Sequence, residues 1–131
     1  YKLNVRHSTF FFGRAEQCDV PSILNSFDIF LALSRSESFG VSVIEASAVG
    51  LPVITSDVGG LKEVVCDQMT GYIINMTQYP TDEQINKLSL LAINKKLRMS
   101  MGNAGRQFVK EKYEYELCAS RMSDFYQNIL K

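Results

Sequence analysis

The sequence predicts an α/β fold, a Rossmann-like parallel sheet with flanking helices. Short apolar runs bounded by glycine and proline alternate with helical patterns through the first half of the chain. Parallel strands covered by helices on both faces have this nearly continuous apolar character. The 131 residues, 46% of them apolar, are enough for one domain that buries about two-thirds of its unfolded surface.

Strands and helices are expected to alternate from residue 9 onward. Four strands are predicted, over residues 9–12, 29–33, 53–56 and 72–75. A short helix over 21–26, which Asp19 would cap, separates the first two strands. A second helix is expected over 41–49 and a third, shorter one over 61–65, each preceded by glycine.

The remainder of the chain is expected to be helical. Thr81 and Gln84 have the spacing of a capping box at the start of the first of these helices. Its apolar face would carry Ile85, Leu88, Leu91 and Ala92. Two more helices, over 97–112 and 116–130, are expected to close the domain. Their apolar residues would form packing surface, among them Phe108, Val109, Leu117, Met122, Phe125 and Ile129.

The segment over residues 37–60 carries most of the functional signal. Gly40 allows a ligand to approach the main chain closely, and the mostly apolar run after it predicts a compact helix. The amide groups at this helix start, over residues 39–42, have no partner within the helix, and the positive end of the helix dipole lies beside them. Such a helix start attracts an anion, for example a diphosphate.

Two glutamates, Glu37 and Glu45, flank this helix start. Glu45 lies roughly 7 Å along the axis from the anion site, at about 1.5 Å per residue. A carboxylate there can accept hydrogen bonds from the vicinal hydroxyls of a ribose next to a diphosphate. Glu37 would face the other side of the phosphates, where a transferred sugar would lie. Glutamates at this spacing also occur in ordinary charged sequences, so the surrounding residues carry the rest of the argument.

The whole segment resembles the carboxy-terminal domain of retaining GT-B glycosyltransferases of the group 1 type, family 4 in the carbohydrate-enzyme classification. That family's pattern runs Glu-x-Phe-Gly, a second Glu, Ala-x-Ala-x-Gly-x-Pro-Val, then Gly-Gly-x-x-Glu and a closing Gly. This chain matches the pattern at Glu37, Phe39, Gly40, Glu45, Ala46, Ala48, Gly50, Pro52, Val53, Gly59, Gly60, Glu63 and Gly71. The similarity extends upstream to Phe12 and downstream to Tyr126, so it covers nearly the whole chain.

The resemblance implies a role for each matching residue. Glu37 matches the glutamate that contacts the donor sugar hydroxyls and borders the reacting centre, so it is the catalytic candidate. Glu45 matches the ribose-binding glutamate. Arg14 matches a variable loop near the nucleobase, where a solvated surface charge is the other interpretation. The donor-binding segment comprises Ser38, Phe39, Gly40, Val41 and Ser42, and the backbone amides of the last four would bind the sugar and the diphosphate.

The resemblance also implies an activity. Residues 1–131 would be a partial carboxy-terminal donor-binding domain, without the first strands and the acceptor domain of intact family members. The intact enzyme would transfer a hexosyl group from a nucleotide-diphosphate sugar to a sugar, lipid or polysaccharide acceptor, with retention and without a metal or other cofactor. The absent strands hold a basic pair that neutralises the diphosphate. This chain alone is therefore expected to bind the donor weakly and to be inactive.

Composition argues against other classes of function. Fourteen basic and fourteen acidic side chains leave no net charge, so a nucleic-acid partner has no electrostatic support. No apolar run approaches the roughly 20 residues of a membrane-spanning helix. Three scattered cysteines and a single histidine, His7, predict reduced thiols and no metal site. A cytoplasmic protein is expected, and the intact enzyme could associate with the membrane surface.

Two other functions remain open. A nucleotide-sugar epimerase of the same GT-B fold would need its own acid and base groups. A non-enzymatic receiver-like module would use Asp57, at a strand end, as phosphate acceptor, but residues 13–15 lack the acidic pair that such a module needs. The strand over 9–12 would have no neighbours in a doubly wound sheet. It is expected to close up against 29–33 or to pair with a second chain, which would give a homo-oligomer.

Overall fold

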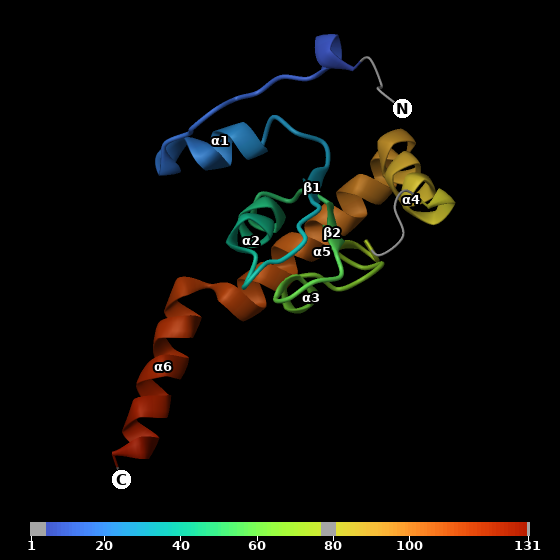
Figure 1. Cartoon of the computed structure of the whole chain (residues 1–131). Coiled ribbons are helices and arrows are strands. Elements are labelled where there is room, and N and C mark those ends of the chain that lie inside the picture. Colours follow the sequence, from blue (N-terminus) through green and yellow to red (C-terminus); the bar gives the residue numbers. More distant parts are fainter. Residues whose placement is uncertain (1–4, 77–80, 131) are drawn as a thin grey trace.

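The computed structural model describes residues 5–76 and 81–130, and a parallel sheet lies at its centre. Three strands, β1 (Phe30–Ala32), β2 (Val53–Ser56) and β3 (Gly71–Ile74), lie side by side in that order (Figure 1). Val53 is in register with Phe30 on one side and with Gly71 on the other. Three of the four predicted strands are therefore confirmed, and β2 has the predicted bounds.

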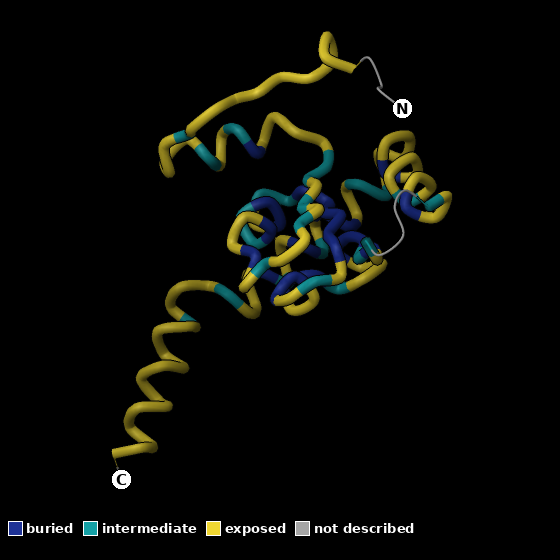
Figure 2. The backbone as a smooth tube through the Cα atoms, in the orientation of Figure 1, coloured by how far each residue is buried: buried dark blue, intermediate teal, exposed yellow. Residues whose placement is uncertain are grey.

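Helices cover both faces of the sheet, as expected. The helices of the chain are the 3-10 helices η1 (Arg6–Ser8) and η2 (Gln17–Asp19) and the α-helices α1 (Val20–Leu24), α2 (Val41–Ala48), α3 (Leu61–Val64), α4 (Asp82–Ile93), α5 (Lys95–Tyr113) and α6 (Tyr115–Ile129), of which α2, α4 and α5 contribute to the cover of the sheet. On one face, Val43 of α2 belongs to the same core cluster as Val53. On the other, Ile54 packs with Leu91 of α4 and Met101 of α5. Figure 2 shows this buried centre between the exposed ends of the chain.

Small residues bring α5 close to the end of α2. A Cβ on Gly102 would overlap the carbonyl oxygen of Gly50, so the two backbones are in contact. Gly50 itself has a φ of +87°, the left-handed conformation with which helices commonly end at glycine. Arg106 donates from Nε to the Ala48 carbonyl at 3.0 Å and from Nη2 to the Val49 carbonyl at 2.8 Å. Arg106 therefore satisfies the terminal carbonyls of α2.

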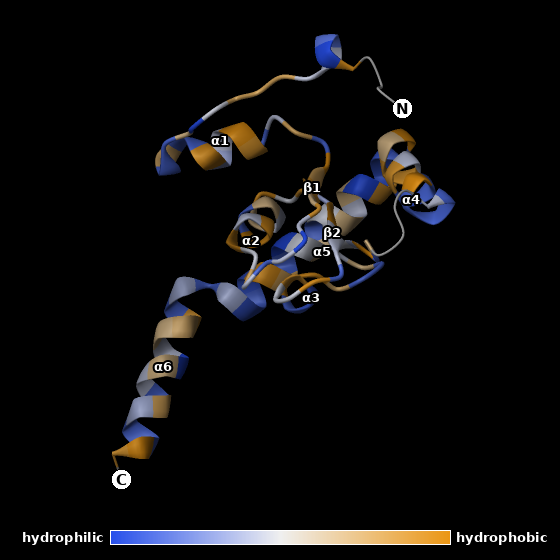
Figure 3. Ribbon diagram, in the orientation of Figure 1, coloured by the Kyte–Doolittle hydropathy of each residue, from blue (hydrophilic) through white to orange (hydrophobic). Residues whose placement is uncertain are grey.

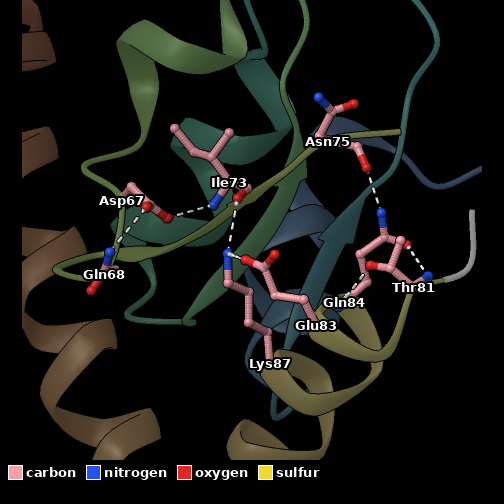
Figure 4. Close-up of polar contacts among 8 residues, drawn as sticks. All are labelled: Asp67, Gln68, Ile73, Asn75, Thr81, Glu83, Gln84 and Lys87. Carbon is pink, nitrogen blue, oxygen red and sulfur yellow. Dashed lines mark hydrogen bonds and ion pairs between the residues drawn. The ribbon is translucent and has the colours of Figure 1, made fainter. Parts of the chain in front are cut away.

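Polar contacts tie the start of α4 to the chain after β3 (Figure 4). The predicted capping box is present: Thr81 Oγ1 accepts from the Gln84 amide at 3.4 Å, and Gln84 Oε1 accepts from the Thr81 amide at 3.2 Å. The Gln84 side chain also donates to the Asn75 carbonyl. The predicted cap of α1 does not form. Asp19 occupies the N-cap position, but its side chain accepts no capping hydrogen bond.

Only part of the predicted apolar face of α4 is buried. Leu91 is fully buried, whereas Ile85 and Leu88 are 52% and 39% exposed. Together with Leu31 and Leu33 they line a shallow apolar pocket beside β1. Within residues 5–76 and 81–130 no further strand pairs with this edge of the sheet, which leaves the pocket uncovered.

The predicted strand over residues 9–12 does not form. Residues 9–16 are neither helix nor strand, and Phe10, Phe11 and Phe12 are 84%, 87% and 60% exposed. This apolar segment runs apart from the sheet (Figures 1 and 3). A strand needs a partner for its backbone groups, and in the described residues β1 pairs with β2 alone. The expected closure against residues 29–33 is therefore also wrong, while pairing with a second chain stays a prediction.

The last helix does not close the domain, contrary to the prediction. α6 has no buried residue and projects away from the sheet (Figures 1 and 2). Its side chains Met122, Phe125 and Ile129 are 55%, 59% and 62% exposed. The backbone of Glu114, with φ −59° and ψ 136°, interrupts the helical conformation between α5 and α6. α6 therefore leaves in a new direction, and its apolar residues do not reach the core that Val109 of α5 enters.

Candidate functional site

The start of α2 presents unpaired amides next to a glycine. Gly40 has a φ of +92°, and a Cβ there would lie 2.8 Å from Leu61 Cδ2, so the position requires glycine. No described residue accepts a hydrogen bond from the amides of Gly40, Val41 or Ser42. These three donors are therefore left unpaired at the positive end of an eight-residue helix.

The Glu37 carboxylate caps its own loop. Its Oε1 accepts a hydrogen bond from the Ser38 amide at 2.9 Å and from the Phe39 amide at 3.4 Å. Of the five residues in the predicted donor-binding segment 38–42, these two therefore have their amides occupied by Glu37. The other carboxylate oxygen, Oε2, has no hydrogen-bond partner among the described residues. It can accept a hydrogen bond from a hydroxyl group of a ligand.

The Gly-Gly turn after β2 packs directly against the Glu37 loop. The Gly60 amide donates to the Glu37 carbonyl at 3.2 Å. A Cβ on Gly59 would overlap that carbonyl oxygen, and a Cβ on Gly60 would overlap the carbonyl oxygen of Ser38. Two backbones approach this closely only where side chains are absent. The sequence predictions included the glycine pair but missed its contact with the loop.

Glu45 faces a pocket between α1 and α2. The pocket has a volume of about 260 Å³ and is lined by Gln17, Val20, Pro21, Leu24, Glu45, Ala48 and Val49. Glu45 is half-buried, and its carboxylate makes no hydrogen bond or ion pair within the described part of the chain. The lining is mostly apolar, which suits a flat ring. The polar residues Gln17 and Glu45 in the same lining suit a ligand that also carries hydroxyl groups. The contribution of α1 was missed, because no local pattern shows that it lies against α2.

The basic residues near the site are placed at its margins. Arg14 is exposed, three residues before Gln17, and forms no hydrogen bond or ion pair among the residues that the structure describes. Lys62 on α3 pairs with Asp57 at 2.7 Å, and the two side chains are 56% and 39% exposed. The carboxylate that a receiver-like module would phosphorylate is therefore engaged by a lysine. Such an exposed pair contributes little to stability.

Residues 5–76 and 81–130 contain neither a candidate metal site nor a candidate membrane-spanning helix. That part of the chain contains no group of three or more His, Cys, Asp or Glu side chains that could hold a metal ion. None of its helices combines the length and the apolar character needed to cross a bilayer. Cys18, Cys66 and Cys118 are free thiols.

Comparison with known proteins assigns the family. The family described as Glycosyl transferases group 1 matches residues 1–108. The chain belongs to the group 1 glycosyltransferases. The N-acetyl-alpha-D-glucosaminyl L-malate synthase of Bacillus anthracis is 32% identical over an alignment of 131 positions, which covers 98% of this chain and 33% of that protein. This result confirms the predicted family and supports a glycosyltransferase among the three functions that the sequence left open.

Solved structures share the fold of this group 1 glycosyltransferase chain. Sucrose-phosphate synthase from Thermosynechococcus elongatus matches with a TM-score of 0.87 and 25% identity, over 97% of this chain and 31% of that chain. Anabaena HepE, in a complex with UDP-glucose, matches with a TM-score of 0.75 and 18% identity, over 88% of this chain and 30% of that chain. The predicted Rossmann-like GT-B fold class is confirmed. The chain spans about a third of the length of these relatives.

Proposed function

We propose that this chain binds the nucleotide-diphosphate sugar donor and that the whole protein transfers a hexosyl group to an acceptor with retention of configuration. The observation that carries the proposal is the arrangement along α2, where three unpaired amides lie one turn from the free Glu45 carboxylate in an open pocket. The fold is shared with a protein whose structure was solved with UDP-glucose, which supports a nucleotide sugar as the donor.

Each part of the donor would have its place along α2. The diphosphate would accept hydrogen bonds from the amides of Gly40, Val41 and Ser42, where the helix dipole favours negative charge. Glu45 lies on the same side of the helix as Val41 and Ser42, because residues three and four apart share a helix face. Its carboxylate would accept hydrogen bonds from two ribose hydroxyls. The nucleobase would enter the pocket beside Gln17.

The sugar would lie at the Glu37 loop. The amides of Ser38 and Phe39 hold Oε1 of Glu37, so in this arrangement they orient the carboxylate and do not contact the donor directly. Oε2 would accept a hydrogen bond from a hydroxyl of the sugar. When the bond to the diphosphate breaks, negative charge grows on the leaving group, and the unpaired amides of α2 would stabilise it. We propose that these groups act by positioning the donor and stabilising the charge on the leaving group, without a metal ion.

The remaining parts of the proposal concern the whole protein. Since the chain spans 33% of its Bacillus anthracis relative, we place the acceptor site, for a sugar, a lipid or a polysaccharide, outside this chain. Arg14 would lie near the nucleobase. Free thiols suit a reducing compartment such as the cytoplasm, and a lipid acceptor would bring the protein to the membrane surface. The exposed apolar segment over 10–12 supports association with a second copy.

Calorimetric titration of the 131-residue chain with UDP and with GDP tests the donor site. Glu45→Ala removes hydrogen bonds to a charged group, worth about 1.5–3 kcal/mol each, so the affinity should fall about tenfold or more. Glu116→Ala is the matched control, because Glu116 is exposed on α6, and it should not change the affinity. Equal affinity before and after Glu45→Ala, or no binding of either nucleotide at millimolar concentration, would contradict the proposal.

A further inference from the structure

Tyr113, the last residue of α5, contacts the Glu37 loop and helix α3. Its hydroxyl donates to the carbonyl of Glu63 on α3 at 3.0 Å. Its ring meets the Phe39 ring edge-on, with 5.8 Å between centroids and 84° between planes. Phe39 belongs to the Glu37 loop, and α3 follows the Gly-Gly turn. One side chain from a distant helix therefore joins the loop to α3, which directly follows the turn.

Further contacts hold the Tyr113 side chain in place. The Phe108 ring packs against it edge-on, at 6.1 Å and 69°. Lys112 Nζ lies 5.4 Å from the Tyr113 ring centroid and donates to the same Glu63 carbonyl at 3.0 Å. Tyr113 is half-buried against the core cluster that contains Val43 and Leu61. Its position is therefore set by α5 and by the core, independently of the loop that it contacts.

Apart from its backbone packing against Gly59 and Gly60, the Glu37 loop has few hydrogen bonds that anchor it. Among the described residues, its backbone link to the turn is the bond from the Gly60 amide to the Glu37 carbonyl. The hydrogen bonds of the Glu37 carboxylate stay within the loop. Phe39 is 44% exposed and directly precedes Gly40. The position of the Phe39 ring therefore influences where the unpaired amides at the start of α2 point.

We infer that Tyr113 is a positioning residue for the donor site, which holds the Glu37 loop at a fixed spacing from α3 and therefore from the Gly-Gly turn that precedes α3. The expected consequence, weaker donor binding when Tyr113 is removed, rests on the proposed function. The family match ends at residue 108 and therefore does not include Tyr113.

Amide hydrogen exchange on the 131-residue chain tests the inference without any ligand. Tyr113→Ala removes the ring contact and one hydrogen bond, so the amides of Ser38, Phe39 and Gly60 should exchange about three- to tenfold faster. The amides of β2 should change less, because they report on global unfolding. Tyr113→Phe keeps the ring contact and leaves Lys112 on the Glu63 carbonyl, so it should restore most of the protection.

Tyr115→Ala is the matched control, because Tyr115 lies two residues further on and is 84% exposed. It should leave all exchange rates unchanged. The inference is overturned if Tyr113→Ala leaves the loop amides unchanged, or if it accelerates loop and β2 amides equally. If the alanine variant does not fold, Tyr113→Leu provides the same comparison, because it retains most of the apolar volume.

Titration with UDP separates this inference from the proposed function. If Tyr113→Ala accelerates exchange in the loop but the unsubstituted chain does not bind UDP, the positioning role stands and the donor site fails. If the unsubstituted chain binds UDP, the alanine variant should bind it about three- to tenfold more weakly, and Tyr113→Phe should recover most of the affinity. Equal affinity in all three proteins would overturn the positioning role and leave the donor site intact.

Discussion

Gly59 lies in backbone contact with Glu37, so close that a Cβ at position 59 would overlap the Glu37 carbonyl oxygen. The amide of the next residue, Gly60, donates to that same oxygen at 3.2 Å. The turn after β2 and the loop before α2 are therefore one packed unit. Because α2 starts from this loop, its unpaired N-terminal amides are positioned by a turn that follows later in the chain.

Gly59→Ala is expected to lower the free energy of unfolding by about 3 kcal/mol, because a steric overlap adds to backbone strain. Gly59 has a φ of +48° and meets the Glu37 carbonyl. Gly13→Ala is the control: Gly13 has a φ of +79° but nothing within 4 Å of a Cβ. Strain alone should cost about 1–2 kcal/mol there. Urea unfolding measures the free energy of unfolding of both variants. Equal losses of stability in Gly59→Ala and Gly13→Ala would show that the contact with Glu37 contributes nothing.

Arg106→Ala is expected to lower the free energy of unfolding by about 1–2 kcal/mol, because it leaves the Ala48 and Val49 carbonyls without their donors. Arg106→Lys should recover only part of the loss, since lysine lacks the planar fork that reaches two carbonyls. Lys110→Ala, at an exposed position of the same helix, should change stability by less than about 0.5 kcal/mol. The capping role is wrong if thermal unfolding finds the two alanine variants equally stable.

Replacing Phe10, Phe11 and Phe12 together with serine is expected to change the free energy of unfolding by less than about 0.5 kcal/mol, because all three are exposed. It should also abolish any dimer that the unsubstituted chain forms, if this segment pairs with a second copy. Sedimentation velocity across a concentration series measures the oligomeric state of the unsubstituted chain and of the serine variant. A dimer that persists in the serine variant would place the interface elsewhere, and a monomeric unsubstituted chain would rule out the homo-oligomer.

Local patterns predicted the elements whose determinants are close together in the chain. The run over 53–56 is short, apolar and β-branched between Pro52 and Asp57, and it forms β2 with those bounds. The capping box at Thr81 depends on residues three positions apart. The helix start at Gly40 follows from glycine's access to positive φ, and the structure has that conformation. These features require no information about distant segments.

Burial could not be predicted in the same way. Phe10, Phe12 and Phe125 have the apolar character of core residues, yet all three are exposed. Whether an apolar side chain is buried depends on the element that lies over it, and for these residues the described chain provides none. The same argument applies to Ile85 and Leu88, which match the helical period of α4 but lie beside the uncovered edge of β1.

By itself, the sequence determined the fold class, the family and the glycine-initiated helix with its two glutamates, because nearby residues encode these features. Only the tertiary structure decided that α1 forms a wall of the Glu45 pocket, that the Gly-Gly turn packs against the Glu37 loop, and that Tyr113 joins this loop to α3. The physical reason is that each of these contacts is a short distance between segments far apart in the chain. Such distances are set by how the helices pack on the sheet.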